Sequence, residues 1–218
     1  MSKKIILHLC ADTGSDTKPY QDDPEYQVIL VGSSIGVENY HVTQPIYGIV
    51  ANPPCTEFSR ARAGGKPTLG DSGMFLVREC QRIIEEARAF GELKFWVMEN
   101  PATGALRNYI GKPNHVYQPW WYGSPWTKKT ALWGEFNMPE RTYYDWSEVE
   151  PNKNLWVRKR NRVVEKDRYT GKPEMHTLHK GAWKHISEFH TLPQPDSDME
   201  FRSICSQKFA QAFKEANS

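Results

Sequence analysis

The residue best placed to act as a nucleophile is Cys55, which follows two prolines in segment 52–55. The apolar run from Ile46 to Ala51 predicts a strand, so this cysteine stands on a turn at a strand end. Two prolines fix the backbone there and expose the side chain that follows. A thiolate at such a turn is favoured if Arg60, Arg62 or the start of a helix lowers the pKa of the thiol. We therefore expect Cys55 to form a covalent bond to its substrate.

Three more polar clusters follow apolar runs that predict strands at 5–10, 28–31 and 95–98, and these clusters span 10–15, 32–39 and 99–103. Apolar residues at helical spacing predict a crossover helix over 74–90. Strands that alternate with helices predict an α/β fold with a mostly parallel sheet and helices on both faces. Because ligands gather at the carboxyl ends of such strands, we expect all four clusters to meet in one crevice.

The second half of the chain is less regular. The stretch 137–195 is rich in Pro, Lys, Arg, His and aromatic residues without clear periodicity. We interpret it as a small basic insertion, while 1–136 and 196–218 form the catalytic domain. Apolar residues from Phe201 to Asn217 predict one helix that docks on the sheet, with Phe209, Ala212 and Phe213 on its buried face.

Four segments, in this order, resemble the DNA cytosine-5 methyltransferases, and in particular their short phage-type members. Segment 53–61 matches the proline-cysteine motif, and 99–101 matches the Glu-Asn motif at a later strand end. Segment 123–130 matches a Gly-x-Pro-Gln-x-Arg-x-Arg motif in position and partly in residues, and 201–213 matches the closing segment. The resemblance implies a Rossmann-like methyltransferase sheet with a small irregular C-terminal insertion.

The resemblance also implies residue roles. Cys55 would add to C6 of cytosine, and Glu99, with a raised pKa, would stabilise the charge at the N3 and 4-amino edge. Lys128 and Thr130 occupy the positions of two arginines that hold the base and its phosphate, and Lys128 lacks the bidentate fork of arginine. Pro54 and Asn100 belong to the substrate-binding motifs. The target base lies inside a duplex stack, so it must be flipped out or supplied single-stranded.

The family uses S-adenosylmethionine, and the resemblance assigns its binding to strand-end residues. These are Asp12, Thr13, Gly14, Ser15, Gly32 and Asn52. Asp12 stands where the pattern has glycine, and Gly32 stands where it has the acid that binds ribose hydroxyls; Glu38 is a later acidic position. Both changes fall among the residues expected to bind the donor and not among those expected to bind cytosine. Either S-adenosylmethionine binds in an altered way, or another donor, 5,10-methylenetetrahydrofolate or formaldehyde, yields hydroxymethylcytosine.

The densest positive cluster runs from Val157 to Arg168, with Arg158, Arg160 and Arg162 in its centre. Alternating charges between apolar flanks favour a hairpin laid on DNA phosphates. Four histidines lie in or beyond this region at spacings that fit no standard zinc finger, so we predict no metal site. They are His176, His179, His185 and His190.

Composition limits the class of protein. The 218 residues carry a net charge of +2 and contain 39% hydrophobic residues, which indicates a soluble globular chain rather than a disordered one. No apolar stretch is long enough to span a bilayer, and no signal-peptide core is present, so we expect a cytoplasmic protein, of a bacterial host if phage-encoded. The four scattered cysteines form no CxxC pair, and Cys10, Cys80 and Cys205 are expected to be buried. Two alternatives stay open, an inactive DNA-binding relative and a modifier of free nucleotides.

Overall fold

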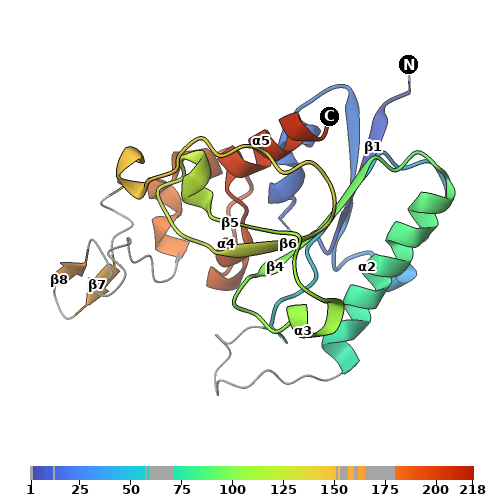
Figure 1. The fold of residues 1–218 in the computed structure, drawn as a ribbon, viewed down its shortest axis with the longest axis horizontal. Helices are drawn as coiled ribbons and strands as arrows, with labels where there is room; N and C mark the ends of the chain where they lie inside the picture. The colour runs from blue at the N-terminus through green and yellow to red at the C-terminus, as the bar shows by residue number, and fades with distance from the viewer. Residues whose placement is uncertain are drawn as a thin grey trace.

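The computed structural model describes residues 2–11, 13–56, 58, 71–150, 152, 157–159, 162–164 and 180–218. A six-stranded sheet forms the centre, with strand order β2-β1-β3-β4-β6-β5 (Figure 1). Its strands are β1 (Lys4–Leu9), β2 (Tyr26–Val31), β3 (Gly48–Ala51), β4 (Phe95–Pro101), β5 (His115–Tyr117) and β6 (Thr130–Glu135). Strands β1 to β4 pair in parallel, whereas β6 is antiparallel to both β4 and β5. The expected α/β class is confirmed.

Short helices and one long helix connect the strands. The α-helices are α1 (Lys18–Gln21), α2 (Asp71–Ala89), α3 (Arg107–Ile110), α4 (Asp198–Ser203) and α5 (Gln207–Ala216). The 3₁₀ helices are η1 (Ser15–Thr17), η2 (Val37–Asn39), η3 (Pro119–Tyr122), η4 (Trp146–Glu148), η6 (Lys180–His185) and η7 (Ser187–Phe189). No helix within the described residues is long and apolar enough to cross a membrane.

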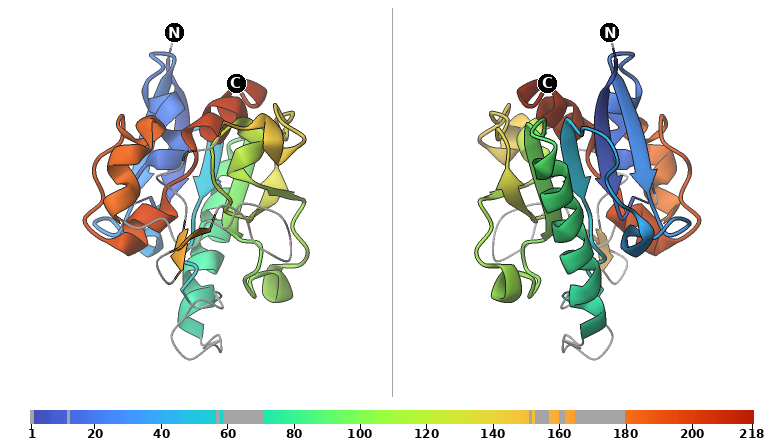
Figure 2. Two further views of the ribbon diagram at one scale, coloured as in Figure 1. Left: turned by 90° about the vertical axis from the view of Figure 1, so that its left-hand side faces the viewer. Right: turned by 90° about the vertical axis from the view of Figure 1, so that its right-hand side faces the viewer.

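Helices cover both faces of the sheet, as the alternating pattern predicted (Figure 2). Helix α2 buries Val77 and Ile84 against the face that carries Leu7 and Ile49. Helix α5 packs Phe209 and its neighbours against the opposite face. Successive strand residues point to opposite faces, so a strand covered on both sides must be apolar throughout. The four residues of β3 are all buried for this reason.

The predicted helix from Phe201 to Asn217 is wrong, because the structure has two helices, α4 and α5, with 204–206 between them. Ile204 is extended and buried in a separate apolar cluster with Trp126 and Phe201. Ser206 then caps the N-terminus of α5, its Oγ accepting from the Phe209 N–H at 3.1 Å. A capping serine and a buried apolar residue in extended conformation stop one helix and start another. The break lets 205–207 contact Ser15 in the loop after β1.

Two strands of the main sheet were not predicted from the sequence, β5 and β6. Each residue of β6 pairs with β4, from Thr130 opposite Pro101 to Glu135 opposite Trp96. This pairing also extends β4 through Pro101, so Glu99 lies on the strand rather than after it. Because β6 is reversed, its first residues, and not its last, lie at the carboxyl edge of the parallel strands.

The carboxyl ends of β1 and β3 flank the point where the strand order reverses direction. From β1 the chain proceeds outward to β2, whereas from β3 it proceeds the other way to β4. Connections leave these two strands in opposite directions, which opens a crevice between their ends. The loops after Leu9 and after Ala51 therefore border the place where an α/β sheet of this kind holds a ligand.

The basic stretch forms a hairpin in the described part, β7 (Val157–Lys159) antiparallel to β8 (Arg162–Val164), separate from the main sheet. The later residues Ile186, Phe189 and Leu192 pack with Trp126 and Phe201 in the third apolar cluster. Part of the predicted insertion 137–195 is thus packed against residues of the predicted catalytic domain. The division into domains at 137 and 195 stays a prediction.

Candidate active site

Asn52 lies at the centre of the polar residues on the carboxyl edge. Its Nδ2 is 3.1 Å from Asp16 Oδ1 and 3.4 Å from Glu99 Oε2, while its Oδ1 is 3.0 Å from His8 Nε2. The Asn52 N–H also donates to the Leu9 carbonyl oxygen, which continues the pairing of β3 with β1 beyond the strand. One side chain therefore links β1, η1, β3 and β4.

Glu99 is held in an environment that favours its protonated form. Burial by the surrounding protein raises the pKa of its carboxyl group, and the charge of Asp16 raises it further. The Lys128 ammonium and the hydrogen bond from Asn52 act in the opposite direction. The raised pKa agrees with the expectation from the sequence, and a protonated carboxyl group at this edge can donate a hydrogen bond to a substrate.

Cys55 faces the same charged groups, since the charges of Glu99 and Lys128 both act on its thiol. Burial raises the pKa of the Cys55 thiol, the Glu99 charge raises it further, and Lys128 lowers it. The lowered pKa expected for this cysteine is therefore not found. Arg60 and Arg62, which were expected to lower it, lie outside the described residues. The thiolate of Cys55 becomes easier to form when Glu99 is neutral.

Asn100 holds the turn that carries Cys55. It is 1% exposed, and its Nδ2 donates to the Pro53 carbonyl oxygen at 2.9 Å. The turn is closed on its other side by the Phe58 N–H, which donates to the Cys55 carbonyl oxygen. The Oδ1 of Asn100 is one of the buried side-chain atoms without a hydrogen-bond partner in the described part of the chain. It remains available to accept a hydrogen bond from a ligand or water.

Lys128 reaches the site because it lies two residues before the reversed strand β6. Its ammonium donates to the carbonyl oxygens of Ser203 at 3.1 Å and Ile204 at 3.3 Å. It thus caps the end of α4 while it acts electrostatically on Glu99 and Cys55. Thr130, the second substrate-binding prediction in this segment, is fully buried, and its hydroxyl donates to the Lys128 carbonyl oxygen. The hydroxyl of Thr130 supports the turn in this structure.

The predicted donor loop after β1 is built around Gly14 and Ser15. Gly14 has φ +64°, and an added Cβ would lie 3.0 Å from Gln21 Nε2, so a side chain at this position would be strained. Ser15 is fully buried, with its Oγ 3.1 Å from Thr13 Oγ1 and donating to Asp16 Oδ2 at 3.0 Å.

The segment between α4 and α5 closes over this loop from the C-terminal side. The Cys205 N–H donates to Ser15 Oγ at 3.1 Å, and Gln207 Nε2 donates to the Ser15 carbonyl oxygen at 3.0 Å. Glu188 accepts from the Gln207 N–H at 2.8 Å and from the Ser124 hydroxyl, which fastens the start of α5. Residues nearly two hundred positions apart thus contact each other at the predicted donor loop.

At the end of β2, the Gly32 carbonyl oxygen accepts from the N–H groups of Ile35 and Gly36, which forms a tight turn. Gly36 has φ +77°, and an added Cβ would lie 2.7 Å from Glu38 Oε1. The Glu38 side chain therefore folds back over this turn. A carboxylate does stand beyond β2, six residues after the position where the family pattern has its acid.

Several predicted site residues are placed only in part. Asp12 and Arg160 lie outside the described residues. Arg158 and Arg162 lie on the hairpin strands β7 and β8, and only their backbone is described. Among the described residues, the structure brings Cys55 and Glu99 together with three other predicted residues at the carboxyl edge of the sheet. These are Asn52, Asn100 and Lys128.

Two residues at the centre of the network were not singled out from the sequence, His8 and Asp16. His8 is 1% exposed in the middle of β1, with its Nδ1 2.9 Å from Thr17 Oγ1. A histidine inside an otherwise apolar strand was a visible signal, because such a ring needs buried partners. Asp16 gave no comparable signal, since acids are common after a strand.

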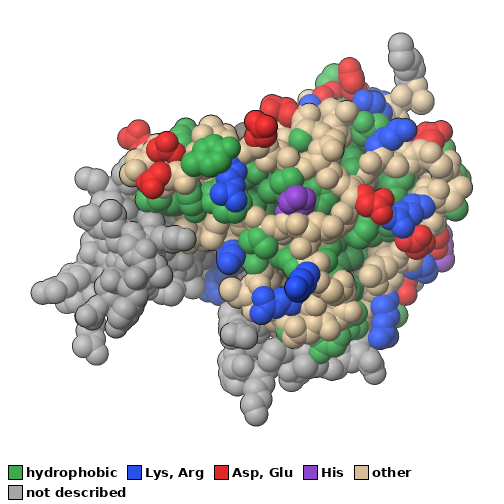
Figure 3. All heavy atoms as spheres, viewed as in Figure 1, with side chains coloured by type: hydrophobic (Ala, Val, Ile, Leu, Met, Phe, Trp, Pro, Cys, Tyr) green, Lys and Arg blue, Asp and Glu red, His purple; other side chains and the backbone are tan. Residues whose placement is uncertain are grey.

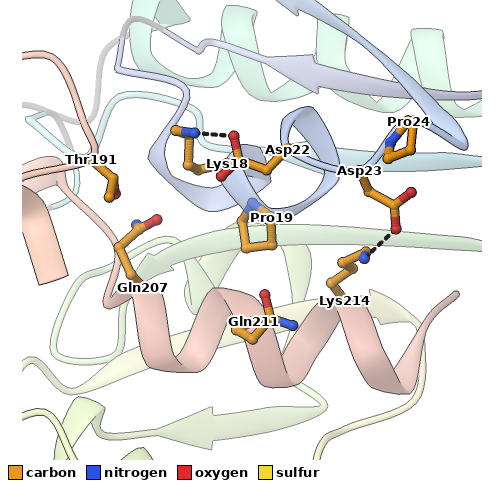
Figure 4. A pocket seen from close by; sticks show the side chains of 9 residues that line it. All are labelled: Lys18, Pro19, Asp22, Asp23, Pro24, Thr191, Gln207, Gln211 and Lys214. Carbon is orange, nitrogen blue, oxygen red and sulfur yellow. Dashed lines mark hydrogen bonds and ion pairs between the residues drawn. The ribbon is translucent and has the colours of Figure 1, made fainter.

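A surface hollow between α1 and α5 is lined by both charged and apolar groups (Figure 4). Its two lysines are paired, Lys18 with Asp22 and Lys214 with Asp23. Because these pairs neutralise its charges, we assign no ligand to this hollow. Among the residues that the structure describes, no three His, Cys, Asp or Glu side chains cluster as metal ligands would. Of the four histidines, His176 and His179 lie outside that part.

Sequence comparison adds one relative. This chain is similar to a viral protein. It is 34% identical over 100 residues to the probable DNA (cytosine-5)-methyltransferase of Frog virus 3 (isolate Goorha). The similarity covers 38% of this chain and 43% of the viral protein, so the chain spans less than half the length of that relative. No family model matches the chain.

Proposed function

We propose that this protein modifies cytosine in DNA, attaching a one-carbon group to C5 through a covalent bond between Cys55 and C6. The observation that carries the proposal is the meeting of Cys55, Glu99 and Lys128 at the carboxyl edge of the sheet. Its second support is the similarity to a probable DNA (cytosine-5)-methyltransferase. An α/β sheet with helices on both faces, as in a Rossmann-like methyltransferase, supplies the scaffold.

Cys55 activates the base in this proposal. Its thiolate adds to C6, and the electron pair of the C5–C6 double bond moves to C5 and is shared with N3. Asn100 holds the turn through Pro53, so the sulfur approaches the ring from a fixed backbone. When C5 later loses its proton, the electron pair re-forms the double bond and the thiolate leaves.

Glu99 and Lys128 stabilise the charge that develops in the ring. The protonated Glu99 carboxyl group donates to N3, where negative charge accumulates on thiolate addition. Because its pKa is raised, the Glu99 carboxyl group is protonated in a larger fraction of molecules at neutral pH than an exposed carboxyl group is. Lys128 favours the thiolate form of Cys55 through its positive charge. The neutral, protonated Glu99 thus assists the ring and the charged Lys128 assists the thiolate.

DNA is the substrate that the surroundings of this edge support. Figure 3 shows Lys and Arg side chains, with few acidic ones between them, in the lower centre of the face that carries α3. The hairpin β7–β8 carries the basic run at 157–164, and we propose that 137–195 contacts phosphates through it. The target cytosine must be flipped out or single-stranded, because its C5 and C6 are otherwise stacked in the duplex.

The donor would bind beside this edge, at the ends of β1 and β2. The tight turn at Gly14 and the exposed carboxylate of Glu38 fit a donor with hydroxyl groups, such as S-adenosylmethionine. When bound, the donor supplies an electrophilic one-carbon unit. The absence of an acid at Gly32 itself keeps a folate methylene or formaldehyde as the alternative carbon source.

Mass spectrometry of nucleosides from DNA incubated with purified protein tests the proposal. Parallel reactions contain S-adenosylmethionine, 5,10-methylenetetrahydrofolate or formaldehyde. We expect 5-methylcytosine with the first or 5-hydroxymethylcytosine with the others, and no product from Cys55→Ala. Cys80→Ala serves as the matched control, because it removes a buried thiol from α2.

The outcomes separate the alternatives. Product from Cys55→Ala would contradict covalent activation by this residue. Unmodified DNA with every donor, together with unchanged DNA binding, would instead favour an inactive DNA-binding relative. Product from free cytidine nucleotides but not from DNA would favour a nucleotide-modifying enzyme.

A further inference from the structure

The Asn52 side chain has only one orientation that its partners allow. Its two amide hydrogens serve two carboxylates, Asp16 Oδ1 at 3.1 Å and Glu99 Oε2 at 3.4 Å. Its oxygen faces His8 Nε2 at 3.0 Å. The reversed orientation would place the amide oxygen against Asp16 Oδ1, and neither an amide oxygen nor an ionised carboxylate oxygen can donate a hydrogen bond. The amide nitrogen therefore points to the acids.

This orientation determines the protonation of His8. Because Asn52 Oδ1 is an acceptor, His8 Nε2 must carry a hydrogen and donate it. The other ring nitrogen, Nδ1, lies 2.9 Å from Thr17 Oγ1, which is itself held by Gln21 Nε2. The imidazole is thus fixed at both nitrogens inside β1, and it can hold the Asn52 amide in place.

The same orientation determines which oxygen of Glu99 can carry a proton. Oε2 accepts from Asn52, so a proton on the carboxyl group resides on Oε1. Asp16 stands on the other side of the same amide, and its negative charge opposes ionisation of Glu99. Other titratable groups that act electrostatically with Glu99 come from further parts of the fold. They are Cys55 after β3, Tyr117 on β5, Lys128 before β6 and Cys205 before α5.

We propose that His8 and Asp16 are positioning residues for Glu99. His8 fixes the Asn52 amide, the amide holds Glu99 Oε2, and Asp16 keeps the proton on Oε1, from which it reaches the substrate. The role of that proton in the reaction rests on the proposed function. The network itself is a property of the free protein and can be measured without substrate.

The test is the titration of the Glu99 carboxyl carbon by NMR in ¹³C-labelled protein, with Glu99→Gln to assign the signal. Asp16→Asn keeps the shape and removes the charge, so the Glu99 midpoint should shift to lower pH. His8→Phe removes the donor to Asn52 and loosens the bond that favours ionised Glu99, so the midpoint should shift to higher pH. His8→Gln restores a donor near the position of Nε2 and should return the midpoint toward the unaltered value.

Asp22→Asn is the matched control, because it removes one acid from an exposed pair with Lys18 outside the network. It should leave the Glu99 midpoint unchanged. Unchanged midpoints in both Asp16→Asn and His8→Phe would overturn the proposal, and so would shifts of the same sign in both. If His8→Phe fails to fold, Asp16→Asn decides the question alone.

A second readout separates this inference from the proposed function. In active protein, Asp16→Asn should move the alkaline limb of the pH profile of kcat/KM to lower pH, because Glu99 loses its proton earlier. If the NMR midpoints shift as expected but no donor yields modified cytosine, the network stands and the proposed reaction fails. If product forms but the midpoints do not respond, the reaction stands and the network assignment fails.

Discussion

Asn100 donates a hydrogen bond from Nδ2 to the carbonyl oxygen of Pro53 over 2.9 Å, and so ties the end of β4 to the turn before Cys55. Both groups are at the edge where the parallel strands end. This single bond connects the strand that carries Glu99 to the turn that carries the nucleophile. The distance between the two reactive groups therefore depends on it.

Loss of this bond should lower both the stability of the fold and the rate of catalysis. Asn100→Ala leaves the Pro53 carbonyl oxygen without its partner, which should cost about 1–3 kcal/mol of unfolding free energy. We expect kcat to fall by about 10- to 100-fold, because the turn loses its fixed position. Denaturant unfolding and single-turnover kinetics measure the two effects.

Asn114→Ala is the control for this variant. Asn114 lies outside the site, and its Oδ1 accepts a hydrogen bond of 2.9 Å from the Gly134 N–H. It should lose stability without a comparable loss of kcat. Equal losses of kcat in both variants would show that the Asn100 effect is only general destabilisation.

The reactivity of Cys55 should respond in opposite directions to its two charged neighbours. The Glu99 charge raises the pKa of the thiol, so Glu99→Gln should lower that pKa and speed alkylation. Lys128 lowers the pKa, so Lys128→Met should raise it and slow alkylation. Iodoacetamide labelling of the Cys55 peptide between pH 7 and 9 measures both, and a several-fold difference in rate between the variants is expected. Labelling rates that change in the same direction would contradict the assigned electrostatics.

Glu99 should lower the stability of the fold at neutral pH. Its pKa is raised in the folded protein above the ordinary value of 4.5, so the folded state binds this proton more tightly than the unfolded state does. The stability that this tighter proton binding contributes is fully present below the pKa of Glu99 in the unfolded state. It is lost as the pH rises through the pKa of Glu99 in the folded state. Glu99→Gln should therefore be more stable than the unaltered protein at pH 7, by about 1 kcal/mol.

This difference should shrink as the pH falls toward the unfolded pKa, which urea unfolding at a series of pH values can follow. Glu85→Gln is the control, because Glu85 is an exposed acid on α2 that pairs with Arg88. A stability gain for Glu99→Gln that stays constant down to pH 4 would show that ionisation is not its cause.

The basic hairpin should determine the salt dependence of DNA binding. Replacement of Arg158, Arg160 and Arg162 by alanine should reduce the slope of log K against log salt by about 0.9 for each DNA phosphate that the hairpin no longer neutralises. Fluorescence anisotropy with a labelled duplex at several salt concentrations gives this slope. Arg88→Ala is the control, because Arg88 pairs with Glu85 and Glu135 at the far end of α2. An equal change of slope in the control would exclude a specific role for the hairpin.

Local patterns were enough to predict much of the framework. The parallel strands β1 to β4 and the helix α2 follow from apolar runs and helical spacing, because burial on one or both faces imposes those patterns on neighbouring residues. The strand-end position of Cys55 follows for the same reason, since Pro53 and Pro54 must end the strand that precedes them. These inferences need only residues that are close together in the sequence.

Long-range pairing decided the rest. Lys128 reaches the site because β6 inserts in reverse between β4 and β5, and no pattern within 123–130 reveals the direction of that strand. The break between α4 and α5 depends on Ile204 packing with Trp126 and on the Cys205 N–H meeting Ser15. Such interactions stabilise the fold only when distant segments have already come together, so they leave little periodic trace in the sequence.

The pKa of the Cys55 thiol also depends on both local sequence and long-range structure. The sequence by itself determined that a cysteine stands at a strand end. Only the tertiary structure decided that burial and the nearby Glu99 charge outweigh Lys128 and raise the pKa of its thiol. Electrostatic effects on a buried group depend on every charge within several ångströms, and those charges come here from separate strands.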